Sequence, residues 1–378
     1  MPDASPAREI TAPIILFAFR DAARIARICR ALRAQRGVVL DQRRIFLLAD
    51  GAVSARTGRR YATGTEIAAT IAAFRDAFPR GEVLAATGNL GIARNIARGE
   101  ALAFETLGAP SAFFFEDDLE PGPWYLLMLD TIREATARLG GVAHFAAYGD
   151  HRAPAAPGPA GWTQLEHHWA FGLHRDAWLR LRMELAPYEA AIAADDYQER
   201  DHGRVFGMWQ GQEMSHVATS QDAARALAAA RLGLARINTR ACFGLYFGET
   251  GQHFTPEIYR AHGFGDAQVR RDGPLALSPL DAGLLAGFVA AEGERYRRLR
   301  RSDLADRLAA WRASHADPSR PASVADIDAL YRLLADRTEA PPAARALAGR
   351  PIAEVRAWVL RTPEPALLRA LRPQRPGS

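Results

Sequence analysis

Residues 111–122, SAFFFEDDLEPG, decide how the rest of the chain is interpreted. The run Ala112–Phe115 is wholly apolar and holds three aromatic residues, which is the pattern of a short strand buried on both faces. A Glu-Asp-Asp string follows directly, and the stretch ends in a Pro-Gly pair that favours a turn. The sequence therefore predicts a buried strand that ends in adjacent carboxylates.

Carboxylates placed side by side at the end of a buried strand repel one another. At about 5 Å and an effective dielectric constant of about 20, two such charges repel by roughly 3 kcal/mol. A divalent cation carrying a diphosphate would offset this repulsion, and ligands of parallel sheets bind at this edge. The stretch predicts a metal–diphosphate site; the alternative is an acidic loop whose charges pair with nearby arginines.

The composition is that of a soluble globular protein. The chain has 378 residues, of which 48% are hydrophobic and 24% charged, so it has room for two or three domains. All 48 basic residues are arginine, and the net charge is +5. This surplus suits nucleotide, phosphate or anionic-membrane partners. Nucleic acid is not expected as a partner, because no basic run is interleaved with aromatics and no zinc-finger spacing occurs.

The cysteine content and the ends of the chain indicate a compartment. Cys29 and Cys242 lie far apart in sequence, which argues against a disulfide framework and favours a reducing environment. The N-terminal residues lack the build of a signal peptide. No apolar run approaches the roughly 20 residues that a transmembrane segment needs. We expect a cytoplasmic protein, at most peripheral to the inner membrane.

Strand and helix patterns alternate through the first 140 residues. Short apolar runs occur at 13–19, 44–49, 83–86 and 112–115, and helical spacing at 22–36, 65–78, 91–107 and 124–139. This alternation predicts an α/β fold with a parallel, doubly wound sheet flanked by helices. Arg20, Asp50 and the acidic string each follow a strand, so we expect them to meet at the ligand-binding edge.

Beyond residue 140 the pattern continues and then changes. A further strand is predicted at 142–148, a Pro/Gly/Ala loop at 153–161, a helix at 222–232 and a strand at 235–239. From residue 277 helical patterns rich in Ala, Leu and Arg dominate. The predicted units are a disordered lead (1–12), an α/β domain (13–270, with halves 13–140 and 141–270) and an all-helical C-terminal domain (277–378).

Four stretches in the same order resemble a known family. PSAFFFEDDLEPGPWYLLML resembles the strand and acidic motif of the GT-A glycosyltransferases, and is similar to N-acetylglucosaminyltransferase I and to bacterial glycosyltransferases that build surface polysaccharides. PIILFAFRDAARIARICRAL looks like the family's first strand and helix, and NLGIARNIARGEAL like the helix before the acidic strand. TSQDAARALAAARLGLARINTRACFGLYFGETGQHFTPEIY looks like its catalytic-base helix, next strand and closing loop. The similarity spans residues 13–265 and implies a GT-A-like, mostly parallel sheet.

The resemblance implies a role for individual residues. Asp118 would ligate Mn²⁺ or Mg²⁺, with Glu116 and Asp117 holding the ribose and the geometry of the site. Asp222 falls at the position of the catalytic base. The other residues implied in donor binding are Arg20 for phosphates or base, Asp50 for the base, Arg94 and Asn95 for the nucleotide, and His253 in the loop that closes over the diphosphate.

The chemistry of sugar transfer needs few groups. A cation held by one or two carboxylates stabilises the leaving diphosphate, and one carboxylate takes the proton of the acceptor hydroxyl. A single base with no carboxylate nucleophile gives direct displacement with inversion. Asp222 begins a predicted helix, where the dipole keeps it ionised; the alternative is a structural Asp near a Ser/Thr cap. Three other aspartates are candidates for the same role: Asp195, Asp196 and Asp201.

An aromatic segment is the candidate acceptor site. His168 and Trp169 precede Gly172, and tryptophan faces stack on sugars; the alternative is an aromatic residue of the core. His253, in a Gly-rich loop, is a candidate to bind the phosphates or metal; the alternative is an exposed loop residue.

These observations predict a metal-dependent, inverting hexosyl- or N-acetylhexosaminyl-transferase. Its donor would be a nucleotide sugar, with UDP favoured, and its acceptor a saccharide or glycoconjugate, as in bacterial polysaccharide biosynthesis. One alternative is a sugar-phosphate nucleotidyltransferase, disfavoured because residues 19–24 contain no glycine. The other is a non-catalytic adaptor that binds a protein partner, or a second copy, through its helical C-terminal domain.

Overall fold

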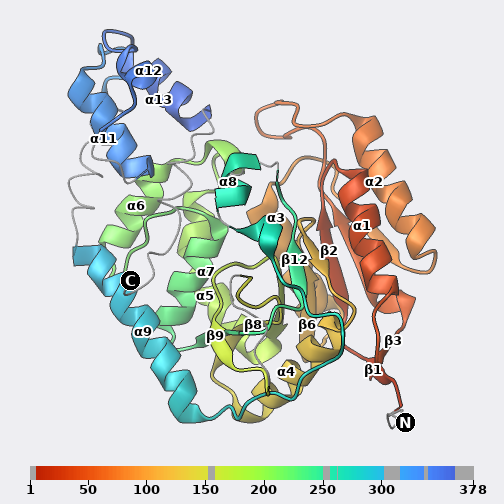
Figure 1. Cartoon of the computed structure of the whole chain (residues 1–378). Helices are drawn as coiled ribbons and strands as arrows, with labels where there is room; N and C mark the ends of the chain where they lie inside the picture. The colour runs from red at the N-terminus through yellow and green to blue at the C-terminus, as the bar shows by residue number, and fades with distance from the viewer. Residues whose placement is uncertain are drawn as a thin grey trace.

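The computed structural model describes residues 6–151, 158–249, 256–261, 263–301, 316–335 and 339–361. In this part of the chain an eight-stranded sheet runs in the order β5-β4-β2-β6-β10-β8-β11-β9 (Figure 1). Its strands are β2 (Ile14–Ala18), β4 (Ile45–Ala49), β5 (Glu82–Ala85), β6 (Ser111–Phe115), β8 (Val142–Ala146), β9 (Trp162–Gln164), β10 (Ala170–His174) and β11 (Ala235–Thr239).

The sheet is mixed, with a parallel half. Strands β5, β4, β2 and β6 are parallel to one another, and β11 is parallel to β8. Strand β10 runs antiparallel between β6 and β8, and β9 antiparallel to β11. The predicted α/β fold with a mostly parallel sheet flanked by helices is confirmed.

Helices cover both faces of this sheet. Their bounds are α1 (Ala22–Arg33), α2 (Gly64–Ala77), α3 (Ile92–Ala101), α4 (Tyr125–Leu139), α5 (Arg175–Ala191), α6 (His202–Gln210), α7 (Gln221–Arg231), α8 (Pro256–Ala261), α9 (Ala282–Arg301), α11 (Val324–Ala335), α12 (Pro342–Arg345) and α13 (Ile352–Arg361). Short helical turns lie at Gln42–Arg44, Leu102–Thr106, Tyr197–Glu199 and Phe264–Asp266. Figure 1 shows α1 and α2 on one side of β2, and α5 and α7 on the other.

The apolar runs become strands because both of their faces are buried. In β6, Ala112 and Phe114 pack in the core under α3, α5 and α7, while Phe113 and Phe115 pack in the core under α1 and α4. Side chains alternate between the two faces of a strand, so a strand covered on both sides has no polar positions. This packing holds the end of β6 rigidly in the middle of the molecule.

Two smaller sheets complete the fold. Strand β1 (Arg8–Ile10) pairs in parallel with β3 (Val38–Leu40), and β12 (Gly244–Tyr246) pairs antiparallel with β7 (Leu119–Pro121). The disorder predicted for residues 1–12 is corrected at β1, because backbone pairing to β3 and the burial of Ile10 order it. Residues 1–5 lie outside the described ranges.

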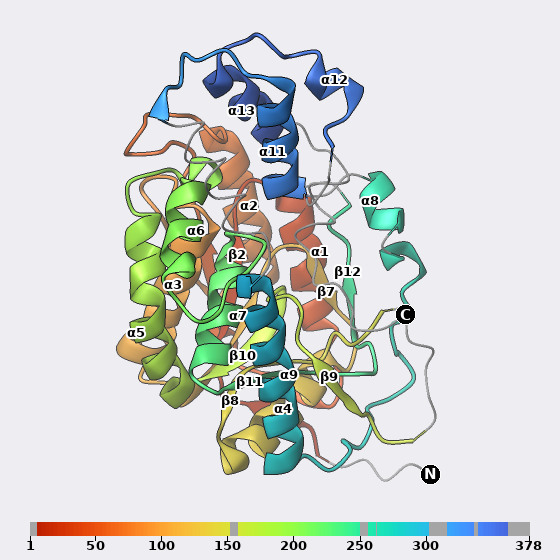
Figure 2. The same cartoon turned by 90° about the vertical axis from the view of Figure 1, so that its left-hand side faces the viewer.

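The C-terminal helices form two groups. Helix α9 packs on β11 and α7, whereas α11 packs on α12 and α13; Figure 2 shows α11, α12 and α13 gathered at one end of the molecule. The predicted separation of a helical domain at residue 277 stays a prediction. Among the helices of the described ranges, none has the length and apolarity that crossing a bilayer requires.

A buried ion pair fixes α9 to the sheet. The side chains of Arg236 of β11 and Glu292 of α9 are 3% and 2% exposed, and the Nε of Arg236 donates to Oε1 of Glu292 at 3.2 Å. Glu292 also accepts from Tyr296 (2.9 Å) and Gln164 (2.7 Å).

Glu292→Leu should therefore destabilise the whole fold by about 3–5 kcal/mol, because it leaves the guanidinium of Arg236 buried without a counter-charge. Urea unfolding followed by fluorescence measures this. The matched control is Glu213→Ala, which removes the exposed ion pair with Arg297 of the same helix and should cost at most about 1 kcal/mol. Equal losses for the two variants would show that α9 is not tied to the sheet by this pair.

Candidate functional site

The acidic string lies where β6 leaves the sheet. The backbone N–H of Glu116 still donates to the carbonyl oxygen of Trp169, which precedes β10, at 2.7 Å. The chain then turns into β7, and the N–H of Phe247 donates to the carbonyl oxygen of Asp118 at 2.9 Å. The string is thus held between β10 on one side and the segment after β12 on the other.

The three carboxyl groups of this string have raised pKa values. Burial, and then the charge of Asp117, raise the pKa of Asp118 to about 8. Burial, and then Asp118, raise the pKa of Glu116 well above its usual value. Burial raises the pKa of Asp117 to about 6, against the opposing effect of Arg24. Each group is therefore harder to ionise than a free carboxyl.

Nearby arginines neutralise only part of this charge. Arg24 lies 4.0 Å from Asp117, and Arg27 pairs with Glu120 at 2.7 Å. Within the described residues no ion pair joins Glu116 or Asp118 to an arginine, and Oδ1 of Asp118 is buried without a hydrogen-bond partner. The alternative of an acidic loop satisfied by arginines holds for Asp117 and Glu120 but not for Asp118.

A divalent cation is a suitable partner for the unpaired Oδ1 of Asp118. Buried carboxylate oxygens in proteins are normally hydrogen-bonded or bound to a cation. The described residues contain no group of three or more His, Cys, Asp or Glu side chains that could hold a metal by themselves. A cation such as Mg²⁺ needs only one or two carboxylates when phosphates and water supply its other ligands. Asp118 therefore fits a cation that arrives with a diphosphate.

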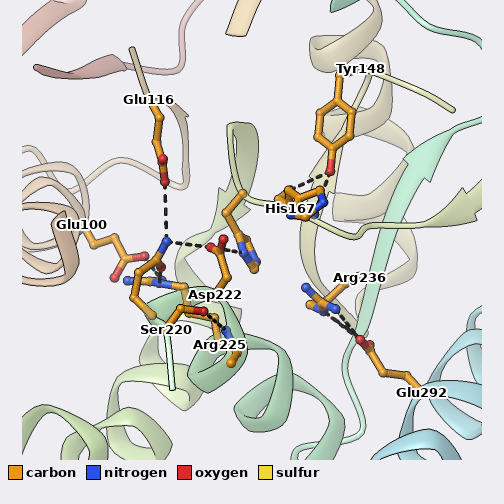
Figure 3. A network of polar contacts seen from close by, with 12 residues as sticks. Glu100, Glu116, Tyr148, His167, Ser220, Asp222, Arg225, Arg236 and Glu292 are labelled. Atoms are coloured by element: carbon orange, nitrogen blue, oxygen red, sulfur yellow. Dashed lines mark hydrogen bonds and ion pairs between the residues drawn. The ribbon is translucent and has the colours of Figure 1, made fainter. Parts of the chain in front are cut away.

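Asp222 faces the acidic string from the start of α7. Ser220 caps this helix by accepting from the N–H of Ala223 (3.2 Å), which places Asp222 in the first turn. Oδ1 of Asp222 accepts from Nε2 of Gln221 at 2.6 Å, and the same nitrogen lies 3.5 Å from Oε1 of Glu116 (Figure 3). Gln221 thus bridges the predicted base to the acidic string, although the two are more than 100 residues apart in sequence.

The environment of Asp222 suits a base. Its side chain is 32% exposed, so a substrate can reach it. Burial of the rest of the side chain raises the pKa of Asp222, while the neighbouring His167 and Arg225 lower it. A carboxylate with a raised pKa holds a transferred proton better than an ordinary one.

The other aspartates considered for this role have structural partners. Asp196 accepts from the hydroxyls of Ser54 (2.6 Å), Thr57 (2.6 Å) and Tyr61 (2.8 Å). Asp201 caps α6, and Asp195 accepts from the N–H of Asp201. Their hydrogen bonds fix loops around the site.

The predicted donor residues divide into exposed and buried groups. Arg20 is exposed, and its Nη1 donates to the carbonyl oxygen of Tyr61 (2.7 Å). Arg94 is half-buried, and its Nη2 donates to the carbonyl oxygen of Ala193 (2.6 Å). Both can exchange a carbonyl for a phosphate. His253 lies outside the described residues.

Asp50 and Asn95 have partners within the fold. Asp50 accepts from the backbone N–H groups of Gly51, Leu90 and Gly91 and from the side chain of Asn89. These bonds occupy the four lone-pair sites of a carboxylate, so a base contact would have to replace one of them. Asn95 is 2% exposed and donates to the carbonyl oxygen of Leu48 at 3.1 Å. We leave both out of the proposed site.

The predicted acceptor residues are also packed against other residues of the fold. The ring of Trp169 stacks between His167 (centroids 4.3 Å apart) and Tyr246 (4.0 Å), so both of its faces are covered. Gly172 lies within β10, where the ring of Phe145 fills the space that a side chain would take. His168 is fully buried. For these physical reasons we correct the acceptor assignment and do not carry the three residues forward as sugar contacts.

Sequence reasoning missed Gln221 and the hydrogen bond from His168 to Asp222 (2.9 Å). The only local signal for Gln221 was its place between a Ser cap and Asp222 at a predicted helix start. The bond from His168 spans 54 positions and has no local signal.

The raised pKa of Asp118 predicts how stability depends on pH. An unfolded Asp has a pKa of about 3.9, whereas burial raises that of folded Asp118 to about 8. The folded state therefore holds more protons between these values, and the contribution of Asp118 to stability falls as the pH rises through this window. In metal-free protein, Asp118→Asn should melt at a higher temperature than the wild type near pH 8, with the difference shrinking towards about pH 5.

Thermal melts in chelator measure this. In separate melts without chelator, Mn²⁺ added together with a nucleoside diphosphate should raise the melting temperature of the wild type only. An Asp118→Asn variant that melts below the wild type near pH 8 would contradict the assignment of an uncompensated charge to Asp118.

No protein-family model matches the chain, and no curated protein matches it in sequence. Several solved structures are similar to it. One is the mannosyltransferase PcManGT from Pyrobaculum calidifontis, in complex with GDP-Man and Mn²⁺, at 15% identity over 97% of this chain and 88% of that one, with a TM-score of 0.39. Another is the galactosyltransferase LgtC with donor and acceptor sugar analogues, at 12% identity over 68% of this chain and 98% of that one, with a TM-score of 0.31. A third is TarS from S. aureus, at 10% identity over 86% of this chain and 48% of that one, with a TM-score of 0.30.

Proposed function

We propose that this protein is a metal-dependent glycosyltransferase that moves a sugar from a nucleotide-sugar donor to a hydroxyl group of a saccharide or glycoconjugate. The observation that carries the proposal is the buried, unpartnered Oδ1 of Asp118 at the end of β6. The cation that satisfies it binds a diphosphate, and the same edge of the sheet presents Asp222 as a base. The family resemblance of residues 13–265 supports the same reaction.

Each group at the edge has one task. Asp118 holds Mn²⁺ or Mg²⁺, which when bound stabilises the charge that develops on the leaving diphosphate. Glu116 and Asp117 hold the ribose and keep the shape of the turn. Arg20 is exposed and Arg94 half-buried. Both lie at the same end of the parallel strands and bind the phosphates or nucleotide.

Asp222 acts on the acceptor. The acceptor oxygen forms a bond to the anomeric carbon, its proton passes to the carboxylate of Asp222, and the bond to the diphosphate oxygen breaks with the electron pair staying on the diphosphate. A reaction with one base and no carboxylate nucleophile inverts the configuration at the anomeric carbon. We propose UDP as the preferred nucleotide and a hexosyl or N-acetylhexosaminyl group as the transferred sugar.

The setting of the reaction belongs to the same proposal. We propose a cytoplasmic enzyme of bacterial polysaccharide biosynthesis, at most peripheral to the inner membrane. The helices α11–α13, which pack on one another, are proposed to bind a protein partner or a second copy.

Asp118→Ala should abolish metal-dependent turnover of nucleotide sugars while the fold survives, because the cation loses its protein ligand. A panel of UDP- and GDP-sugars tested for Mn²⁺-dependent hydrolysis measures this without knowledge of the acceptor. Glu120→Gln is the control, since Glu120 pairs with Arg27 and should be dispensable for turnover. Full activity of Asp118→Ala in Mn²⁺ would refute the metal assignment.

Asp222→Asn should keep the affinity for nucleotide and Mn²⁺ but lower transfer by about 10²–10⁴-fold, the usual contribution of a general base. Isothermal titration and initial rates separate the two effects. Asp195→Asn serves as the control, because Asp195 accepts from the N–H of Asp201 and pairs with Arg204 at 3.5 Å, both at the start of α6. If it were Asp195→Asn that lost transfer, the base would lie in the segment before α6. Absence of metal-dependent nucleotide binding in the wild type would instead favour the adaptor.

A further inference from the structure

His168, in the predicted acceptor segment, contacts the proposed base directly. Its Nδ1 lies 2.9 Å from Oδ1 of Asp222, and the residue is fully buried. Its ring packs edge-on against His144 (centroids 4.5 Å apart) and Phe171 (5.3 Å). The imidazole therefore has little freedom to rotate away from Asp222.

The carboxylate of Asp222 determines which ring nitrogen of His168 carries the hydrogen. An ionised carboxylate only accepts hydrogen bonds, so Nδ1 must carry the hydrogen. Burial, and then the charges of Arg236 and Arg225, lower the pKa of His168 well below its usual value. The ring is neutral, and its Nε2 is buried without a partner among the described residues.

A neutral hydrogen-bond donor orients a carboxylate and leaves it able to accept a proton. An imidazolium beside Asp222 would stabilise the ionised form strongly and make it a poor proton acceptor. The neutral N–H of His168 and the amide of Gln221 both bond Oδ1. In the described residues no hydrogen bond is made to Oδ2 of Asp222, which leaves this oxygen for the acceptor hydroxyl.

We propose that His168 is a positioning residue for sugar transfer, which holds Oδ1 of Asp222 so that Oδ2 takes the proton of the acceptor. The proposal rests on the proposed function of Asp222 as the base. It assigns His168 a role distinct from the sugar contact predicted from the sequence. A purely structural role for His168, as a filler of the core, is the competing explanation.

Two substitutions at this position separate the explanations. Asn places an amide nitrogen as many bonds from Cα as Nδ1 is, so His168→Asn keeps a donor to Asp222. His168→Leu fills the pocket but removes the donor. Loss of a hydrogen bond to a charged group should lower kcat roughly 10- to 100-fold in His168→Leu, with little change in the affinity for nucleotide and Mn²⁺. His168→Asn should recover most of the lost kcat.

His174→Leu is the matched control. It removes a buried imidazole whose hydrogen-bond partner is the hydroxyl of Thr136, at the end of β10 that pairs with Ser111 and not with Phe115, so kcat should change little. Thermal melts of all variants show whether each is folded. Unchanged kcat in folded His168→Leu, or equal losses in the Leu and Asn variants, would overturn the positioning role while leaving the glycosyltransferase proposal intact.

A second measurement does not depend on turnover. Nitrogen-15 NMR of the wild-type imidazoles should show His168 neutral with its hydrogen on Nδ1. A signal from the Nε2–H tautomer, or from an imidazolium, would overturn the proposal even in an active enzyme. A wild-type protein that binds nucleotide but transfers no sugar would refute the proposed function itself, an outcome visible before any variant is made.

Discussion

Mutual repulsion of carboxylates at the end of β6 is the constraint on which the candidate site depends. Burial is the largest effect that raises the pKa of Glu116, and the charges of Asp118, Asp222 and Asp117 raise it further. Arg24 offsets part of this charge at Asp117, but Asp118 has no such partner in the described residues. In the proposed function, a cation bound with its phosphates would relieve this repulsion, so that binding of the donor and relief of the repulsion would be the same event.

The fold holds these groups in place by burying both faces of the strand that carries them. The aromatic residues of β6 pack alternately into the two cores, so the turn that follows has a rigid base. The antiparallel strand β10 then brings residues 167–169 beside Glu116. The N-terminus of α7 meets them there, and Gln221 and His168 converge on one oxygen of Asp222.

Much of the fold follows from local pattern. The strands 14–18, 45–49 and 111–115 are continuous apolar runs, which only a sheet covered on both faces accommodates. The helix starting at Gln221 is marked by its Ser cap. The direction of β10 was not predictable, because period and composition carry no information on strand orientation. The pairing of β1 with β3 depends on a partner about 30 residues away and was missed for the same reason.

The site was predictable where charge and burial conflict within a few residues, as at Glu116–Asp118. The site could not be predicted where the role of a side chain depends on partners that are distant in sequence but adjacent in the fold. Asp50 follows a strand as a ligand-binding acid does, yet the N–H groups of the loop before α3 take up its oxygens. Trp169 has the chemistry of a sugar platform, yet His167 and Tyr246 cover both faces. Sequence shows which groups can do chemistry, and packing decides which remain available.

A crystal structure of the protein with manganese and a nucleoside diphosphate would show whether a cation links Asp118 to the diphosphate, because manganese is identified by its anomalous scattering. We expect a manganese peak at bonding distance from the carboxylate of Asp118, with diphosphate oxygens among its other ligands and Asp222 facing the space beside it. A nucleotide bound elsewhere, or a manganese-free acidic turn whose Asp118 is paired with an arginine, would contradict this expectation.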